Sequence, residues 1–550
     1  MSFDRRHGIT PLRHSRVYAL LGSAAPREKP RDSRTLFAFR QLTLSTPFRF
    51  PTAPSFAHKG ADRQVKEVKK ISQETFDESV QDNIDMFDMD REEAIKESIE
   101  QFELMKVDIT GISTHITAEE EAATPVVAAI DLLKDYAQFD TISVEDMIAN
   151  LEIVSEQCAD KDCQSIAGRN QAVTVVCVIM EKLNHPDSGA AQETVLALLS
   201  CFMALLKNSQ DNKDRVSEKH AAVLCVCARK YVDNTEVLTS AMKCICRSCV
   251  ATETSKEAFW FEPIDIADLV LSSLRSFTSD KDMLLVLCMT VRCLVADDDM
   301  RTPASGAFKR GRKMAEYGAV PALLGPMAEY NEDPDVLSSL YATLNIIIND
   351  SVAKNVRKEK GLAIIRKGFL QHKSHSDAAR NGVSLLRSLA GNDDLKIDML
   401  RTETLQAVVA VTKEHFDDEA ICAQCAMFFA AVSLRQPDNV EALMKVGFAE
   451  LIMNVMKTHA AHEETQRQCC HAIRNAVARD YKKEYVPKFV ELGAEGAANN
   501  VTRRFPRCGD ISRACVRDLG FEYEGSLVGR PAHELMHDAQ TPENDGQTMT

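Results

Sequence analysis

A polar residue set within a long apolar, helix-like stretch recurs along this chain at intervals of forty-odd residues. The stretches read CICRSCVA, MTVRCLVA, LNIII, SLLRSLAG, FFAAVS, HAIRNAVA and ACVRDLG. Their landmark positions are Arg247, Arg292, Asn345, Arg387, Ala430, Arg474 and Arg517, with a weaker copy at Cys201. Glycines that precede an apolar helix start recur with a similar period, at Gly318, Gly361, Gly447 and Gly493. The pattern indicates a tandem array.

A period of this length, built from helices without the alternation typical of strands, indicates armadillo or HEAT repeats. In such arrays each unit buries its apolar face only against its neighbours. We therefore predict an all-α, right-handed superhelical solenoid of about eight repeats with an N-terminal helical segment. One interval is long, because 53 residues separate Arg292 from Asn345. Insertions in solenoids map to loops, so we expect a polar surface loop between Asp297 and Gly318.

Charge is distributed unevenly along the 550 residues, whose formal net charge is -15. Residues 1–60 hold eleven Lys and Arg and three acidic residues, so they carry +8 and leave -23 for the remainder. An Arg-rich, acid-poor start resembles an organellar transit peptide, and a disordered extension is the alternative. The acidic body argues against general nucleic-acid binding, which needs a basic field. No run of 18 apolar residues is present, so we expect no membrane span.

Composition and periodicity divide the chain into five segments. They are a basic, disordered extension (1–62), acidic amphipathic helices (63–112), a linker (113–125), the repeat solenoid (126–523) and a disordered tail (524–550). The acidic helices carry two apolar stripes, Phe76, Val80, Ile84 and Phe87 in the first and Ile95, Ile99 and Phe102 in the second. Two roles are open for these helices: capping the first repeat or docking in the groove of a partner.

Two kinds of motif resemble metal sites. The stretch from His533 to His537 reads HELMH, the zinc-protease signature, but it lies in a polar tail and a third ligand is not evident. Cysteine spacings at Cys158/Cys163, Cys244/Cys246/Cys249 and Cys422/Cys425 also suit metals, yet two of these three groups fall in helices of the array. Cysteine packs there as a small apolar residue, and the odd total of 17 favours free thiols in a reducing compartment. We predict no enzyme activity, metal or cofactor.

Arginine dominates the repeating landmark position. In armadillo folds the third helix of each repeat lines the concave surface, so this position forms a ladder along one groove. Guanidinium is permanently charged and suited to carboxylate and phosphate, which predicts binding of an extended acidic or phosphorylated partner segment. The predicted partner-binding residues are Arg247, Arg292, Asn345, Arg387, Arg474, Asn475 and Arg517. The alternative is that each arginine pairs with an acidic residue of the next repeat and only braces the array.

A dense basic run, KRGRK, spans Lys309 to Lys313 within the expected loop. In an exposed loop such a run can act as a nuclear-import signal, and a solvated charge run is the alternative. We expect a cytoplasmic protein. The alternatives are the nucleus, reached through import by this run, and the mitochondrion, reached through targeting by residues 1–60.

Several stretches, taken in order along the chain, resemble the armadillo repeat-containing protein 6 family from Ile71 to Glu524. They are ISQETFDESVQDNIDMFDMDREEAIKESIEQFE at 71–103, DDDMR at 297–301, AGNDDLK at 390–396, RQPDN at 435–439, ELGAE at 491–495 and RDLG at 517–520. Residues 1–62 precede the usual start of the family, so an over-extended gene model is another explanation of the basic segment. The resemblance implies a cytosolic or nuclear armadillo array without established catalysis or cofactor.

The predicted function is therefore a non-catalytic scaffold or adaptor that binds a protein partner along the groove. A structural assembly factor that acts through its ends is the alternative, and a zinc-dependent hydrolase built on the HELMH stretch is the unfavoured one.

Overall fold

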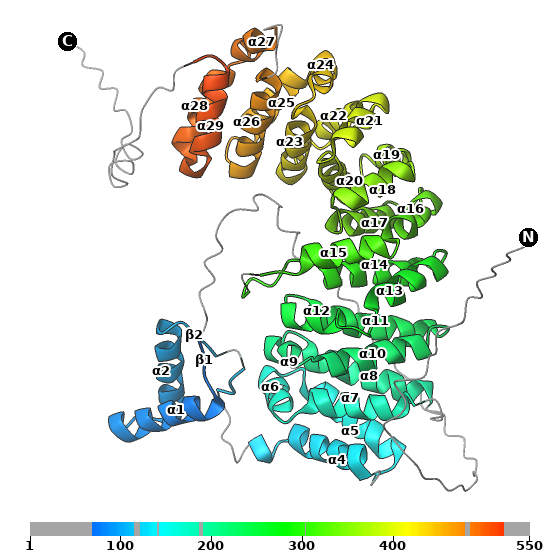
Figure 1. Ribbon diagram of the computed structural model, residues 1–550. Coiled ribbons are helices and arrows are strands. Elements are labelled where there is room, and N and C mark those ends of the chain that lie inside the picture. Colours follow the sequence, from blue (N-terminus) through cyan, green and yellow to red (C-terminus); the bar gives the residue numbers. More distant parts are fainter. Residues whose placement is uncertain are drawn as a thin grey trace, which may run out of the picture. The chain divides into compact units, whose positions relative to one another are not determined.

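The computed structural model describes residues 69–109, 111–114, 121–139, 142–185, 191–302, 304–478 and 484–521. Within these ranges the chain is almost entirely helical (Figure 1). The predicted extension at 1–62 and the predicted tail at 524–550, with its HELMH stretch, lie outside the described residues. No helix in the described ranges is long and apolar enough to cross a membrane.

Eight three-helix repeats occupy the described part of the chain from Lys161 to Asp518. The first helices are α6 (Lys161–Arg169), α9 (Gln210–Asp214), α12 (Glu253–Phe259), α15 (Ala307–Glu316), α18 (Asp350–Lys358), α21 (Asp393–Arg401), α24 (Pro437–Lys445) and α27 (Tyr485–Glu491). The second helices are α7 (Ala172–Leu183), α10 (Glu218–Lys230), α13 (Ile266–Ser276), α16 (Ala319–Glu329), α19 (Gly361–Gln371), α22 (Thr404–Glu414), α25 (Phe448–Thr458) and α28 (Ala494–Arg504). The third helices are α8 (Gln192–Leu206), α11 (Thr235–Cys249), α14 (Lys281–Val295), α17 (Pro334–Ile346), α20 (Ser376–Leu389), α23 (Glu419–Ser433), α26 (Glu463–Val477) and α29 (Gly509–Asp518).

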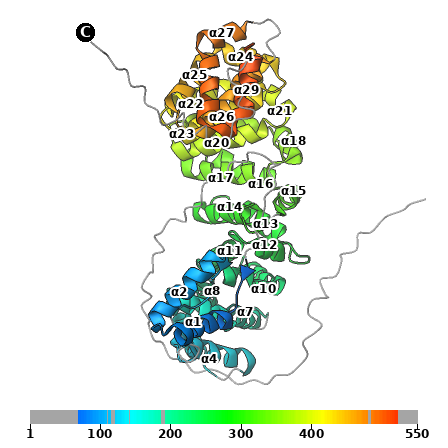
Figure 2. The same ribbon diagram turned by 90° about the vertical axis from the view of Figure 1, so that its left-hand side faces the viewer.

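The repeats stack in chain order. Each third helix packs on the third helix of the next repeat, and most second helices pack on one another in the same way (Figures 1 and 2). Two further helices, α4 (Pro125–Phe139) and α5 (Val144–Gln157), pack on α7 and α8 and extend the stack by a partial repeat. Because every repeat buries its apolar side against its neighbours, the array is a solenoid. The predicted all-α armadillo fold is confirmed.

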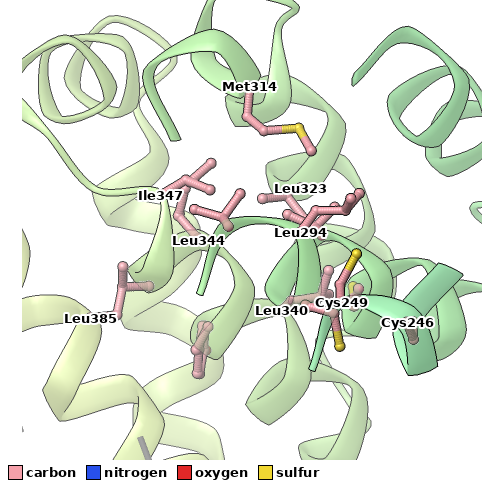
Figure 3. Close-up of a cluster of buried hydrophobic side chains, with 14 of the residues drawn as sticks. Cys246, Cys249, Leu294, Met314, Leu323, Leu340, Leu344, Ile347 and Leu385 are labelled. Carbon is pink, nitrogen blue, oxygen red and sulfur yellow. The ribbon is translucent and has the colours of Figure 1, made fainter. Parts of the chain in front are cut away.

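One continuous core runs through the array from Val126 to Leu519. Figure 3 shows a part of it, where Leu294, Leu344 and Leu385 come from three successive third helices. Cysteines belong to the same core, as Cys246 illustrates, and the 17 thiols are all free. The cysteine groups that resembled metal sites therefore serve mainly as packing residues.

Short polar residues determine where the third helices begin. Asn234, Asp280, Asp333 and Asp418 cap α11, α14, α17 and α23, each accepting a hydrogen bond from a backbone N–H in the first turn. These side chains satisfy donors that a helix start leaves free. His375 and His462 cap α20 and α26 in the same way, whereas α8 and α29 have no side-chain cap. Because a cap begins most of the third helices, these helix starts are encoded locally.

In most repeats the turn between the first and second helices contains a residue with left-handed backbone. Gly318 and Gly447 adopt φ values of 82° and 84° at this place, as glycine does without steric cost. Gly361 does not, because it is already the first residue of α19, and the left-handed residue is Lys360 with φ 54°. The glycine landmarks thus mark the same turn in their repeats, except that Gly361 lies one residue after the left-handed position.

Three histidines join neighbouring repeats where second helices end. His372, His415 and His459 each donate from Nε2 to a backbone carbonyl of the preceding repeat, at 2.8, 2.7 and 2.8 Å. These bonds satisfy carbonyl groups of Asn331, Lys373 and Phe416, which lie in loops. The spacing of the histidines carried this signal in the sequence, but we did not predict the contact.

The acidic segment forms a small module with its own core. Helices α1 (Gln73–Phe87) and α2 (Arg91–Leu104) follow one another, and β1 (Lys69–Lys70), before α1, pairs in parallel with β2 (Val107–Asp108), after α2. The core of this module comprises Phe76, Ile95, Phe102 and Ile112. One stripe prediction is wrong, because Phe87 is 64% exposed at the end of α1.

The predicted loop between Asp297 and Gly318 is wrong in its second half, which forms α15. The extra residues lie in the connection from α14 to α15, where Lys256 contacts Asp298 and the Arg301 guanidinium contacts the Asp299 and Asp214 carboxylates. Arg310, within the predicted basic run, is buried and paired with Glu253. The basic run is therefore helical, and one of its arginines forms an internal ion pair. This removes the exposed loop on which the nuclear-import hypothesis depended.

Candidate binding face on the third helices

All seven predicted partner-binding residues lie on third helices, at matching places in successive repeats. Arg247 is on α11, Arg292 on α14, Asn345 on α17, Arg387 on α20, Arg474 and Asn475 on α26, and Arg517 on α29. We call the surface carried by these seven residues the third-helix face. Because packed helices lie about 10 Å apart, one landmark residue follows another at roughly that interval.

Near the start of the face, Arg247 is half-buried on α11. Burial lowers the pKa of its guanidinium, while thiols of Cys244 and Cys246 have a smaller opposite effect. Lys213 lies close enough for the two cations to repel, and it donates to the carbonyl of Val250 at 3.1 Å. This part of the face therefore concentrates positive charge.

Arg292 and Asn345 contact the next repeat through neutral groups. The Arg292 guanidinium donates to the Ser339 carbonyl at 3.0 Å, the Ser339 hydroxyl at 2.9 Å and the Thr343 hydroxyl at 2.8 Å. Asn345 Nδ2 donates to the Ser384 hydroxyl at 3.1 Å, while its Oδ1 is buried without a hydrogen-bond partner. These contacts brace the stack through neutral acceptors.

Arg387 on α20 differs from the other landmark arginines. Its Nη1 donates to the Met427 sulfur at 3.2 Å, a weak acceptor. Burial lowers the pKa of this guanidinium, and the carboxylate of Glu464, two repeats further on, opposes the shift. Among the described residues, no carboxylate forms an ion pair with Arg387. At the middle of the face a half-buried cation thus has no paired carboxylate in the part of the chain that the structure describes.

The last part of the face follows the bracing alternative. Arg474 Nε donates to Asp518 Oδ2 at 2.8 Å, and Arg517 donates to the other oxygen of the same carboxylate at 3.0 and 2.8 Å. Asn475 Nδ2 donates to the Ala430 carbonyl at 2.8 Å. Asp518 therefore neutralises much of the positive charge at this part of the face.

Two features of the described residues bear on metal and thiol chemistry. The described ranges hold no group of three or more His, Cys, Asp or Glu side chains that could bind a metal ion. Burial raises the pKa of thiols throughout the core, to about 12 for Cys422 and Cys425. Such thiols stay protonated near neutral pH, and the thiol form is a poor ligand and nucleophile.

Sequence periodicity missed the partners of the landmark residues. Ser339, Thr343 and Ser384 bind Arg292 or Asn345, but they do not recur at the period. All three lie on third helices, two to six residues before the landmark of the same helix. A search for hydroxyl residues at those places could have found them.

Comparison with known proteins identifies the array. The ARMC6 family model matches residues 128–526, and the model described as Armadillo repeat-containing protein 6 N-terminal domain matches residues 68–126. Armadillo repeat-containing protein 6 from Homo sapiens is 26% identical over 406 residues, covering 71% of this chain and 79% of the human protein. The homolog from Drosophila melanogaster is 25% identical over 383 residues, covering 69% and 80%.

A solved structure described as "A conserved phosphorylation switch controls the interaction between cadherin and beta-catenin in vitro and in vivo" is also similar. It aligns with a TM-score of 0.53 at 11% identity, covering 73% of this chain and 79% of that chain. At this identity the likeness concerns the fold alone. The family models, in contrast, together span most of the sequence from residue 68 to residue 526. The chain belongs to the armadillo repeat-containing protein 6 family.

Proposed function

We propose that this chain is a non-catalytic scaffold that binds an extended acidic or phosphorylated segment of a partner protein along the third-helix face. The observation that carries the proposal is Arg387, a half-buried guanidinium without a carboxylate partner among the described residues. Taking a charge out of water is costly unless a counter-charge is supplied. A partner carboxylate or phosphate would supply it.

The spacing of the landmarks suggests the form of the ligand. An extended peptide advances about 3.3 Å per residue, so it meets a new repeat about every three residues. Acidic or phosphorylated residues at that interval match the arginines. Arg387 is the favoured contact, since Asp518 already satisfies Arg474 and Arg517.

The scaffold role agrees with the family and with the fold, neither of which brings a catalytic motif. A cytoplasmic location is part of the proposal. It is supported by the 17 free cysteines, which a reducing compartment keeps as thiols.

The test measures fluorescence anisotropy of a labelled twelve-residue peptide with glutamate at every third position, in glycine and serine. The matched peptide carries glutamine in place of glutamate, and a third carries phosphoserine. Arg387→Glu is expected to weaken binding of the glutamate peptide by about tenfold or more, since a close charge pair is worth about 1.4 kcal/mol or more. The glutamine peptide should bind wild type weakly.

Lys367→Glu is the matched control, because Lys367 is exposed on α19 of the same repeat. This substitution changes the charge by the same amount at a position outside the third-helix face. It should alter binding less than about twofold. Equal losses in both variants, or unchanged binding by Arg387→Glu, contradict the proposal. If Arg387→Glu lowers helical content, Arg387→Gln takes its place with the same expectation. Binding should also weaken with salt, because the Debye length falls from about 10 Å at 0.1 M to about 3 Å at 1 M.

A further inference from the structure

Helices α1 and α2 form an antiparallel hairpin. Asn83 Nδ2, on α1, donates to the Ser98 hydroxyl on α2 at 2.9 Å. Earlier on α1, the ring of Phe76 lies 6.0 Å from that of Phe102, which is later on α2. The two helices therefore run in opposite directions, and the end of α1 lies beside the start of α2. We call residues 82–93, which include the turn between the helices, the hairpin tip.

Large apolar side chains are exposed at the hairpin tip. Met86 is 70% exposed and Phe87 is 64% exposed at the end of α1, and Met89 is partly exposed in the turn. The core of the module is formed by other residues of the two apolar stripes. Because those stripes pack inside the hairpin, neither helix can offer its stripe to the groove of a partner. The apolar surface that remains open lies at the helix ends.

Carboxylates surround these apolar side chains. The twelve residues of the hairpin tip include six acids and one arginine, so they carry -5. All six acids are exposed, and none of them forms an ion pair with a described residue. They are Asp82, Asp85, Asp88, Asp90, Glu92 and Glu93.

Folding of the hairpin accounts for only some of the acids. Asp90 caps α2, and Glu93 lies in its first turn, where a negative charge suits the helix dipole. Asp85 and Asp88 lie instead at the C-terminal end of α1, which carries a partial negative charge, and no basic residue lies in the last turn of that helix. Acids at such an end are unfavourable. Departures from local rules of this kind are typical of functional sites.

The opposite end of the hairpin is equally apolar but much less acidic. Leu104 and Met105, at the end of α2, are 83% and 61% exposed. The twelve residues 95–106 hold three acids and two lysines, so they carry only -1. Exposed apolar side chains thus occur at both ends, and a dense negative charge accompanies them only at the hairpin tip. The charge therefore indicates the kind of partner that this end fits.

We propose that the hairpin tip docks a basic amphipathic helix of a partner protein. The apolar side of that helix covers Met86, Phe87 and Met89, and its lysines and arginines meet the surrounding carboxylates. Methionine suits this role, because its flexible side chain adapts to different apolar partners. The same carboxylates repel an anionic lipid surface and a second copy of the tip. This surface is separate from the third-helix face, and the proposal does not depend on the proposed function.

The test measures fluorescence anisotropy of a labelled eighteen-residue peptide of lysine and leucine, added to the full chain. Its leucines are spaced to lie on one side of a helix. A matched peptide carries alanine in place of each leucine and therefore has the same charge. The leucine peptide should bind wild type at least about tenfold more tightly than the alanine peptide, because only leucine offers a large apolar side chain to the tip. Equal binding of the two peptides overturns the proposal.

The apolar contact is tested with the double variant Met86→Ser and Phe87→Ser. It should weaken binding of the leucine peptide by at least about tenfold, because two exposed apolar anchors are lost. The matched control is Leu104→Ser with Met105→Ser, which removes a similar apolar area from the other end of the same module. It should change the affinity by less than about twofold.

The charge contact is tested with Asp82→Asn, Asp85→Asn and Asp88→Asn together. These changes should weaken binding by about tenfold. They should preserve the fold, since asparagine accepts the left-handed backbone of residue 88 and a neutral side chain suits the end of α1. The control removes the same charge from three exposed acids of the array and should change affinity less than about twofold. Its substitutions are Glu257→Gln, Glu359→Gln and Glu491→Gln.

Other outcomes overturn the proposal. Equal losses in the tip variants and their controls indicate non-specific attraction to an acidic protein. A wild-type dimer in solution that Met86→Ser with Phe87→Ser dissociates identifies a second copy as the occupant. Arg387→Glu should leave binding of the leucine peptide within about twofold, because Arg387 lies on the third-helix face. Failure of the leucine peptide to bind therefore refutes the docking at the tip alone, whereas failure of the glutamate and phosphoserine peptides refutes the proposed function alone.

Discussion

Breaking the ion pair between Glu253 and Arg310 should loosen the contact between α12 and α15. Arg310 Nη1 lies 2.7 Å from Glu253 Oε1, and Nη2 lies 2.9 Å from Oε2. The two side chains are only 4% and 8% exposed. Arg310→Met keeps much of the volume but leaves the Glu253 carboxylate buried, with the Gly306 N–H as a remaining donor at 2.6 Å. Removing one partner of such a pair costs about 3–5 kcal/mol.

The assay is hydrogen exchange followed by mass spectrometry, because a repeat array opens locally and a single unfolding midpoint is not well defined for it. A loss of about 3 kcal/mol corresponds to an opening constant about 150-fold larger. Amides of α12 and α15 should exchange faster by this factor. The exchange rates of amides in α25, which lies three repeats after the repeat of α15, should not change.

The double variant Glu253→Gln with Arg310→Met supplies the control. It removes both charges, so its cost should be clearly smaller than that of Arg310→Met alone. An increase in exchange of less than about tenfold for Arg310→Met would refute the reasoning, since it corresponds to about 1.4 kcal/mol. A double variant as unstable as the sum of the single variants would also refute it.

Three further predictions concern the array. Burial alone raises the pKa of Glu253 and Asp299, but hydrogen bonds from arginines and backbone N–H groups outweigh it and hold both pKa values below their usual range. The stability that these carboxylates contribute is present above the ordinary carboxyl pKa and is lost as the pH falls through the lowered values. After correction for intrinsic exchange rates, the protection of amides in α12 and α15 should therefore be full at pH 6 and should fall below about pH 4. Unchanged protection at pH 3 would contradict this. Gly382→Ala should destabilise the contact of α19 with α20 by about 1–3 kcal/mol, because the added Cβ would lie 2.5 Å from an aromatic ring carbon. Gly496→Ala, whose Cβ would have no neighbour within 4 Å, should stabilise α28 by about 0.5–1 kcal/mol in the same exchange assay. Equal effects would contradict the close approach. Thiol titration at pH 8 should detect about one reactive cysteine in the native protein, the half-buried Cys163, and all 17 after denaturation; rapid reaction of several native thiols would contradict their burial.

The repeat architecture could be read from the sequence because its determinants are local. Apolar periodicity placed all the landmark residues from Cys201 to Arg517 on third helices, and the caps that begin those helices recur with them. Each repeat needs only its neighbours to bury its apolar side, so a regular period is sufficient to predict the stack. The position of the extra residues after Arg292 could also be predicted. Their conformation could not, because α15 is held by Glu253, 57 residues before its partner Arg310.

The candidate face divides in the same way. The sequence by itself determined that arginines stand in register, since register follows from the period. Only the tertiary structure decided which groups each of them contacts: Arg474 meets Asp518 44 residues further on, Arg292 meets Ser339 and Thr343, and Arg387 meets a methionine sulfur. Those partners depend on how side chains of adjacent repeats pack, which has no period of its own. Charge compensation is a property of contacts in space, and the repeat pattern specifies only where each arginine stands.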